Sequence, residues 1–431
     1  MENNLLKKRR QIIIHIGMHK TGSSSIQKTL DTNLNDKDFE YASLGPSNHS
    51  GIIQKVFLKN SKRKSSIHNF NSNNISEYRK ILIDNFSIFS EKTMILSAEG
   101  IINLDVNELH DFKLFLDEYF ESIKIVGYIR TPASYMNSAF QQKIKAGFRE
   151  FDLNKVHPRY KFKFEKFDLV FGKDNVYFWK FNPKIFPSND VVLDFCDKLH
   201  IKINPKNTIR VNESLSKEST QLLYSFNKFS NLENNYFSHA KKRNHLINLI
   251  RTLGKTPFKL SNKLLNPILE QNMNHTKWME ERLFDSLKET IKNDDFSIKN
   301  EDELLDINID VVTNLSQLIE NIYMPQLHTC SKTSDKVILL IEALYQQEVK
   351  KLKNKKINHI LTKTIVNNNP SLLKLIDIET INSIIVETFK LITTELESQQ
   401  TQINLNGFGK FEIKYINEQK RIIFTPCINK K

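Results

Sequence analysis

The chain has 431 residues, of which 39% are hydrophobic and 26% are charged, and its formal net charge is +14. This length exceeds that of one ordinary domain, so two or three domains are expected. No apolar run approaches the roughly 18 to 20 residues that a membrane helix requires, and no membrane span is therefore expected. The positive charge favours anionic partners such as nucleotides, acidic glycans or nucleic acid.

The cysteines and the first apolar stretch indicate the cellular compartment in which the protein is expected. The three cysteines are scattered and odd in number, which argues against a disulfide framework or a zinc cage: Cys196, Cys330 and Cys427. A reducing cytoplasm fits this pattern best. Basic residues precede the first apolar stretch, but that stretch is shorter than a signal-peptide core and leads directly into a glycine loop. We interpret it as the first strand of a domain.

The first two thirds of the sequence alternate apolar, strand-like runs with helical segments, which is typical of an α/β domain with a parallel sheet flanked by helices. The clearest strands are predicted at 11–18, 92–100, 122–130 and 175–181. Ligands bind at the carboxyl edge of such sheets. We therefore expect Lys20, Glu99 and Arg130, which lie near the ends of three of these strands, to face one crevice.

The pattern changes twice further along the chain. From about 213 to 325 helical segments replace the strands, and this part is predicted to be a helical subdomain. The polar stretch 326–335 is interpreted as a linker, and the polar stretch 60–74 as a solvated loop.

The segment "GMHKTGSSS" (17–25) has the outline of a phosphate-binding loop. An apolar run precedes it, and Ile26 and Leu30 begin a helical pattern after it. Backbone N–H groups at a helix N-terminus and nearby serine hydroxyls favour an anion. In the loop that binds ATP or GTP, G-x-x-x-x-G-K-[ST], a lysine follows the second glycine. Here Ser23 takes that position, and the lysine is Lys20. The alternative is a serine-rich turn with no ligand.

This loop resembles the phosphosulfate-binding loop of the sulfotransferases that use phosphoadenosine phosphosulfate (PAPS). In that family the lysine precedes the glycine by two positions and hydroxyl residues follow it. The resemblance implies a P-loop fold, PAPS as co-substrate and no metal. It also implies that the 5′-phosphosulfate is bound by His19, Lys20, Thr21, Gly22, Ser23, Ser24 and Ser25.

A second stretch, "VGYIRTPASYMNSAF", matches the same family. Its strand ends in Arg130, and Thr131 and Pro132 are typical of a helix start. In the sulfotransferases an arginine at such a strand end and a serine eight residues later bind the 3′-phosphate of PAPS, which implies this role for Arg130 and Ser138. A lone arginine more commonly pairs with a surface carboxylate. Weaker similarities to bacterial members lie at 45–57, 210–223 and 260–284, so the resemblance covers about 10–290.

Sulfuryl transfer to a hydroxyl group needs a base at the acceptor and a cation at the leaving phosphate. Lys20 is the candidate for the cation. His49 and Glu99 are alternative bases: His49 lies in the loop after the first helix, and Glu99 follows the strand that contains "MILSA". The alternatives are a surface histidine and a structural carboxylate. His15, within the first strand, is interpreted as a core residue.

The last hundred residues have a different pattern. Apolar residues recur at helical spacing in 354–370 and 377–398, and short strands follow a Gly-Phe-Gly turn. Two helices followed by L-x-G-F-G-x-F, Leu405–Phe411, resemble the HU/IHF family of DNA-architectural dimers. The long basic arm and its wedge proline are absent here, which puts DNA bending in doubt. Phosphate contacts are expected from Lys410, Lys414, Lys420 and Arg421, and the alternative is a dimerisation module.

The sequence thus predicts two modules: a P-loop sulfotransferase-like domain at 10–325, helical from about 213, and a small α+β HU/IHF-like domain at 336–431. The predicted activity is PAPS-dependent transfer to a hydroxyl of a carbohydrate or another small acceptor, with DNA and a second copy of the chain as further partners. The alternatives are a nucleotide kinase or NTPase, and a DNA-binding scaffold with an inactive α/β domain.

Overall fold

The structure is a computed structural model that divides the chain into two compact units. The first comprises Met1–Tyr236, Ile247–Leu315 and Pro325–Ile338, and the second comprises Phe237–Leu246, Ser316–Met324 and Leu339–Lys431. The structure describes residues 11–18, 20–59, 74–88, 90–211, 214–230, 240–289, 296–319, 330, 332–368, 376–398, 402–405, 409–416 and 419–426.

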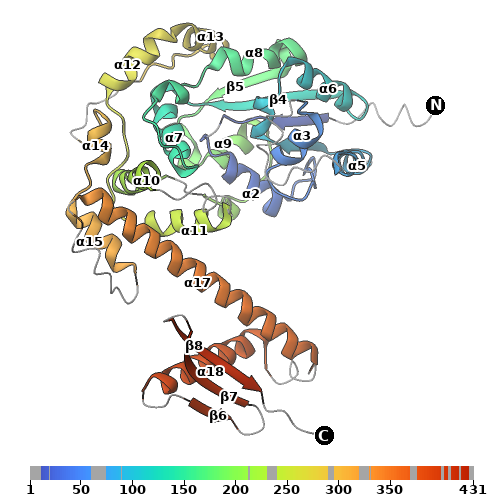
Figure 1. Cartoon of the computed structure of the whole chain (residues 1–431). Helices are drawn as coiled ribbons and strands as arrows, with labels where there is room; N and C mark the ends of the chain where they lie inside the picture. The colour runs from blue at the N-terminus through green and yellow to red at the C-terminus, as the bar shows by residue number, and fades with distance from the viewer. Residues whose placement is uncertain are drawn as a thin grey trace. The chain divides into compact units, whose positions relative to one another are not determined.

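The centre of the first unit is a parallel sheet (Figure 1), which confirms the α/β prediction. Its five strands run in the order β2-β3-β1-β4-β5. Each expected strand is present with shorter bounds, and the sequence did not reveal β2, which is too short to show a pattern. The strands are β1 (Gln11–His15), β2 (Phe39–Tyr41), β3 (Thr93–Ser97), β4 (Ser122–Ile129) and β5 (Val176–Lys180).

Helices cover both faces of this sheet, so its central strands are apolar on both sides. Ile12 and Ile14 of β1 belong to the core on one face, and Ile13 belongs to the core on the other. The first face is covered by α3 (Ser50–Phe57), α5 (Ile75–Phe86), α6 (Val106–Asp117) and α8 (Tyr160–Phe171). The second face is covered by α2 (Ser23–Asn33) and α9 (Val191–Lys198).

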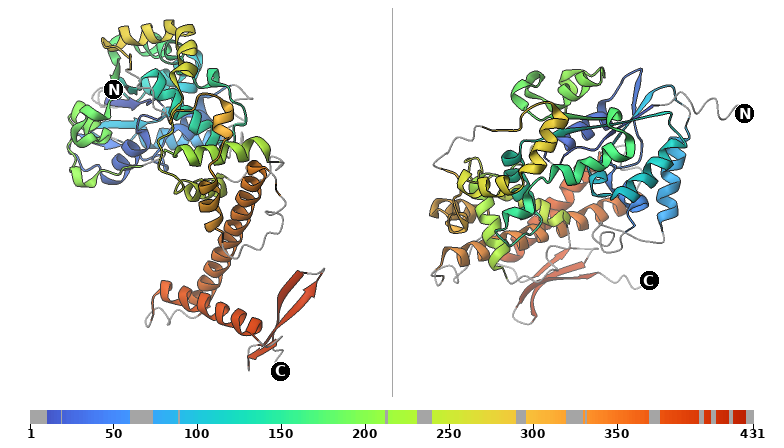
Figure 2. Two further views of the ribbon diagram at one scale, coloured as in Figure 1. Left: turned by 90° about the vertical axis from the view of Figure 1, so that its left-hand side faces the viewer. Right: turned by 90° about the horizontal axis from the view of Figure 1, so that it is seen from above.

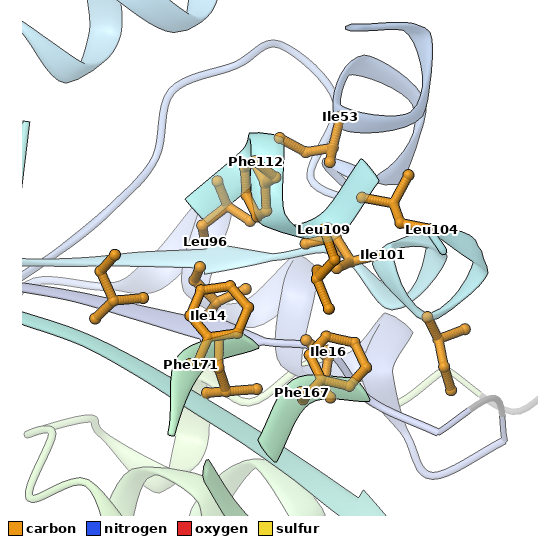
Figure 3. Close-up of a cluster of buried hydrophobic side chains, with 14 of the residues drawn as sticks. Ile14, Ile16, Ile53, Leu96, Ile101, Leu104, Leu109, Phe112, Phe167 and Phe171 are labelled. Carbon is orange, nitrogen blue, oxygen red and sulfur yellow. The ribbon is translucent and has the colours of Figure 1, made fainter. Parts of the chain in front are cut away.

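Aromatic side chains fill the larger core. Figure 3 shows Ile14 and Leu96 of the sheet among Phe112 of α6 and Phe167 and Phe171 of α8. Phe112 and Phe167 are fully buried. Burial of a phenylalanine side chain stabilises the fold by about 1.5–3 kcal/mol. This packing holds the strand ends, and the loops that follow them, in fixed positions.

The helical subdomain packs on α7 (Pro132–Lys145). Met136 and Phe140 of α7 share a core with Leu223 of α10 and Leu265 of α12. The described part of 213–325 contains six α-helices and no named strand. The helices are α10 (Lys217–Phe229), α11 (Ala240–Ile250), α12 (Asn262–Gln271), α13 (Met273–Leu283), α14 (Glu301–Leu305) and α15 (Ile309–Gln317).

Short 3-10 helices connect several of the larger elements. They are η3 (Glu99–Asn103), η4 (Leu153–Val156), η5 (Lys173–Asn175), η6 (Pro183–Ile185), η7 (Pro187–Asn189) and η8 (Pro205–Asn207). The first two bear on the site described below, because η3 begins at Glu99 and η4 follows α7.

The second unit contains α18 (Ile378–Ser398) and an antiparallel sheet in the order β6-β7-β8. Its strands are β6 (Gln402–Leu405), β7 (Gly409–Ile416) and β8 (Gln419–Pro426), and the sheet lies beside α18 in each view (Figures 1 and 2). Most of the expected linker 326–335 and of the loop 60–74 lies outside the described residues. The expected helix at 354–370 is the end of a longer one, α17 (Thr333–Asn368).

Among the described residues, no helix combines the length and the apolar character that a membrane crossing demands.

Candidate functional site

Three neighbouring strand ends meet at one edge of the sheet. Because β1 lies between β3 and β4, the segments that follow these strands adjoin one another. A pocket of about 580 Å³ opens there. Its lining includes five basic side chains and one acidic one: Lys20, Arg130, Lys143, Lys155, Lys163 and Glu99. Ser23, Ser24, Ser25 and Ser138 also line it, so most of the predicted site residues share one pocket.

Gly22 forms the turn that starts helix α2. Its φ of 81° lies in the left-handed region, where residues with a Cβ are strained. A Cβ atom at this position would lie 2.5 Å from Cγ1 of Val191. The backbone therefore packs against α9 with no space for a side chain. This contact holds the N-terminus of α2 at the pocket, which Ser23, Ser24 and Ser25 line.

Lys20 also has a left-handed backbone, with φ of 71°. Its carbonyl oxygen accepts a hydrogen bond from Nη1 of Arg130 at 2.9 Å. A non-glycine residue holds such a conformation only where its surroundings impose it. Arg130 thus fixes the shape of the loop, while the side chain of Lys20 lines the pocket.

The hydroxyl residues of the loop have different surroundings. Thr21 is buried, and its Oγ1 donates to the carbonyl of Met18 at 2.6 Å, so this side chain closes the loop and does not line the pocket. Ser25 accepts the N–H of Val211 at 3.0 Å. The hydroxyl of Ser23 is buried and has no hydrogen-bond partner in the described part of the chain. His19 lies outside the described residues.

Arg130 is held by several groups at the end of β4. Its Nε donates to Oγ of Ser134 at 2.6 Å, and Tyr160 donates to its carbonyl oxygen at 2.5 Å. Burial lowers the pKa of the guanidinium, and the nearby charge of Glu289 acts in the opposite direction. Ser138 lies further along α7 and lines the same pocket. The structure therefore brings Arg130 and Ser138 together, although the hydroxyl that contacts the guanidinium is that of Ser134.

The two candidate bases are placed differently. Glu99 follows β3 and lines the pocket. His49 is only 1% exposed and does not line it. Nδ1 of His49 accepts the N–H of Ser97 at 3.2 Å, so the proton of the neutral ring is on Nε2. Burial lowers the pKa of His49 to about 4, and the Ala42 carbonyl opposes this. Its ring supports the end of β3.

His15 is a core residue, as expected. It is fully buried, and its Nδ1 lies 2.8 Å from Oγ of Ser97, which also accepts from Gln27. Burial lowers the pKa of His15 to about 4, and the charge of Glu99 acts in the opposite direction. The neutral ring joins β1 to β3 directly beneath the loop.

Apart from Ser138, sequence reasoning missed the pocket residues that come from α7, α8 and the segment between them. Tyr135 lies three residues before Ser138 on the same side of a helix, a spacing that would have indicated it. No sequence signal places Lys155, His157 or Lys163, because tertiary packing brings their segments to the pocket.

The proposed phosphate contacts of the tail are partly described. Lys410 and Lys414 flank Glu412 on β7, at 3.0 and 2.7 Å from its carboxylate oxygens. The side chains of Lys420 and Arg421 lie outside the described residues, as does the centre of the Gly-Phe-Gly turn. In the described parts of both units, no three His, Cys, Asp or Glu side chains form a group that would hold a metal ion.

The fold and the pocket define an α/β protein in which a serine-rich loop lines a pocket with several basic residues at the carboxyl edge of its sheet. No protein-family model matches the chain. It is 30% identical over 188 residues, 40% of its length, to an uncharacterized protein of Archaeoglobus fulgidus. The chain spans about half the length, 48%, of that curated relative.

Two solved structures are similar to part of the chain. One is a sulfotransferase from Alicyclobacillus acidocaldarius, at 14% identity and a TM-score of 0.31, covering 51% of this chain and 92% of that one. The other is a sulfotransferase domain from the curacin biosynthetic pathway, at 14% identity and a TM-score of 0.28, covering 46% and 76%. Both likenesses are remote.

Proposed function

We propose that this chain is a sulfotransferase that moves the sulfuryl group of PAPS to a hydroxyl group of a carbohydrate or another small acceptor. The observation that carries the proposal is the single pocket of about 580 Å³, which joins the serine-rich loop, Arg130, Ser138 and Glu99. The loop follows β1, Glu99 follows β3, and Arg130 and Ser138 follow β4, so these groups come from the ends of three neighbouring strands. Their chemistry is complementary to a nucleotide with two phosphate positions.

The loop supplies donors for the 5′-phosphosulfate. The first N–H groups of α2 have no partner within the helix, and the helix dipole adds a partial positive charge there. The buried hydroxyl of Ser23 lacks a partner in the described structure, which is costly unless a ligand accepts its hydrogen bond. Lys20 adds a full positive charge.

Arg130 and Ser138 would hold the 3′-phosphate. Two of the nitrogens of the guanidinium already contact Ser134 and the Lys20 carbonyl, which orients the group and leaves further N–H donors. The contact with the Lys20 carbonyl also couples the two phosphate positions, because the arginine that binds one phosphate fixes the loop that binds the other.

PAPS supplies the sulfuryl group and leaves as adenosine 3′,5′-bisphosphate. Glu99 accepts the proton of the acceptor hydroxyl, whose oxygen forms a bond to sulfur as the bond between sulfur and the phosphate oxygen breaks. The ammonium group of Lys20 stabilises the negative charge left on that phosphate. We assign the base to Glu99 because it lines the pocket, whereas His49 is buried outside it.

Binding without a metal ion tests this proposal against a kinase or NTPase. Adenosine 3′,5′-bisphosphate, titrated in EDTA, is expected to bind the wild type. Lys20→Ala should weaken binding by about 1.5–3 kcal/mol, the usual value for a hydrogen bond to a charged group. Lys37→Ala, at a lysine whose side chain is 78% exposed, serves as the control and should leave binding unchanged. Binding of ATP that requires magnesium, with none of the bisphosphate, would establish the rival function.

A separate observation favours self-association of the tail. Helix α18 exposes large apolar side chains, among them Ile384 at 54% and Leu391 at 62%, which lie seven residues apart and so share one side of the helix. Such a surface on a single helix is typical of an interface. We propose that α18 pairs with α18 of a second copy, and that the HU/IHF-like sequence pattern reflects this dimer, with DNA as a further partner.

Light scattering on the full chain tests the dimer. The wild type should be dimeric, and Leu391→Glu should be monomeric. Glu395→Gln, on the same helix, is the control and should remain dimeric. A monomeric wild type would refute the pairing. Fluorescence anisotropy with duplex DNA, measured over a series of salt concentrations, then tests the DNA contact: affinity should fall as salt rises, and absence of binding at low salt would remove DNA as a partner.

A further inference from the structure

The pocket contains a group of donors that the proposed nucleotide contacts do not use. They are Lys143 on α7, Lys163 on α8 and His157 between these helices. All three side chains line the pocket that Arg130, Ser138 and Glu99 also line.

His157 lines the pocket and contains a buried ring donor. The residue is 4% exposed, and its Nδ1 accepts the N–H of Arg159 at 3.1 Å. The proton of the neutral ring is therefore on Nε2. Burial, followed by the charges of His275, Lys163 and Arg159, lowers the pKa of His157 to about 4, so the ring is neutral near pH 7. Its Nε2 is buried and has no partner among the described residues. This N–H group lacks an acceptor that a ligand oxygen would supply.

Lys143 and Lys163 are cations without a carboxylate partner in the described structure. The ammonium group of Lys163 lies 3.4 Å from the hydroxyl of Tyr135, and that of Lys143 lies over the ring of Phe148. Burial, with repulsion from Arg159 and Lys143, lowers the pKa of Lys163 to about 8. Lys155 differs, since it pairs with Glu150 and Asp152. The repulsion around Lys163 would be relieved by an anion.

This group lies on the side of the pocket where the acceptor would bind. Lys143 follows Ser138 by five residues, so the two project about 140° apart around the axis of α7. Tyr135, which contacts Lys163, lies near Glu99: burial raises the pKa of Tyr135 to about 12, and the charge of Glu99 contributes. The donor group is therefore adjacent to the proposed base, and its Lys143 projects away from the proposed 3′-phosphate contact at Ser138.

We propose that Lys143, Lys163 and the Nε2–H of His157 form an anion subsite that holds a carboxylate or sulfate group of the acceptor while Glu99 takes the proton of its reacting hydroxyl. The acceptor is then an acidic carbohydrate. The role of this subsite in binding the acceptor rests on the proposed function. The preference for an anion can be measured without the nucleotide.

A matched pair of ligands tests the subsite. The two ligands are p-nitrophenyl β-D-glucuronide and p-nitrophenyl β-D-glucoside. The first has a carboxylate where the second has a neutral hydroxymethyl group. Each is titrated at low salt into the full chain, with and without saturating adenosine 3′,5′-bisphosphate. The glucuronide should bind at least tenfold more tightly than the glucoside. Lys163→Met should abolish this preference, whereas Lys163→Arg, which keeps the charge, should retain most of it. Lys161→Met, at an exposed lysine on the same helix, should leave the preference unchanged.

The outcomes separate this inference from the proposed function. Equal binding of the two glycosides, binding of neither, or equal losses in Lys163→Met and Lys161→Met would overturn the subsite. A tenfold loss of bisphosphate affinity in Lys163→Met would also overturn it, because the lysine would then serve the nucleotide. If the wild type prefers the glucuronide but does not bind the bisphosphate, the subsite stands and the sulfotransferase proposal fails.

Discussion

At the scale of single residues, the pocket depends on two backbone conformations that most residues avoid. Gly22 and Lys20 both have positive φ, and only Gly22 does so without strain. The strain at Lys20 is offset by the hydrogen bond between its carbonyl and Arg130. The sequence indicates Gly22 as a loop residue, but it does not reveal the support that Arg130 gives to the loop.

Gly22→Ala is expected to destabilise the first unit. The new Cβ atom would lie 2.5 Å from Val191, and the left-handed backbone alone costs a residue with a side chain about 1–3 kcal/mol. Urea unfolding monitored by circular dichroism measures the loss. Gly51→Ala is the matched control: its added Cβ meets no atom within 4 Å, and the change should be neutral or stabilise by up to about 1 kcal/mol. Equal effects of the two substitutions would contradict this reading of Gly22.

At the scale of elements, the sequence predicted the strands of the sheet better than the pocket residues that come from α7, α8 and the segment between them. β1, β3, β4 and β5 are recognisable because central parallel strands are apolar on both faces. The loop and the start of α7 were found because a glycine turn and a Thr-Pro helix start are local signals. Lys143, His157 and Lys163 come together only through the packing of α8 on the sheet, which no local pattern encodes. The sequence pattern indicated a helix only at 354–370, whereas α17 begins at Thr333.

Helix α6, which follows η3, begins with a capping box. Asp105 accepts the N–H of Glu108, and Glu108 accepts the N–H of Asp105, each at 2.9 Å. Asp105→Ala should reduce the free energy of unfolding by about 0.5–2 kcal/mol, whereas Asp105→Asn, which keeps an acceptor, should cost less. Urea unfolding compares the two variants. Because the rest of η3 separates Glu99 from α6, both variants should bind the bisphosphate as the wild type does. A larger loss in Asp105→Asn would contradict the cap.

At the scale of the whole molecule, three buried histidines make the stability of the first unit sensitive to acid. Burial is the main cause that lowers the pKa values of His15, His49 and His157 to about 4, from 6.5. Between these values the unfolded chain binds protons that the folded chain does not. Stability is therefore full above pH 6.5 and falls as the pH drops toward 4.

The free energy of unfolding is expected to depend steeply on pH. Each of these histidines contributes about 1.4 kcal/mol per pH unit within this window. Urea unfolding between pH 6.5 and 5, above the range where carboxylates titrate, measures the slope. His49→Gln should reduce this slope by about one third, because it removes one of the three buried histidines. His110→Gln, at an exposed position on α6, should leave the slope unchanged. A stability that stays constant over this range would show that the buried rings are not kept neutral.

The most direct test of the account compares two nucleotides in EDTA by calorimetry: adenosine 3′,5′-bisphosphate and adenosine 5′-monophosphate, which lacks the 3′-phosphate. The wild type should bind the bisphosphate more tightly by about 1.5–3 kcal/mol, tenfold or more. Ser138→Ala should reduce that difference, and Ser87→Ala, at the C-terminal end of α5 and outside the pocket lining, should preserve it. Equal affinity for the two nucleotides, or binding of neither, would contradict the assignment of Arg130 and Ser138 and with it the proposed sulfotransferase activity.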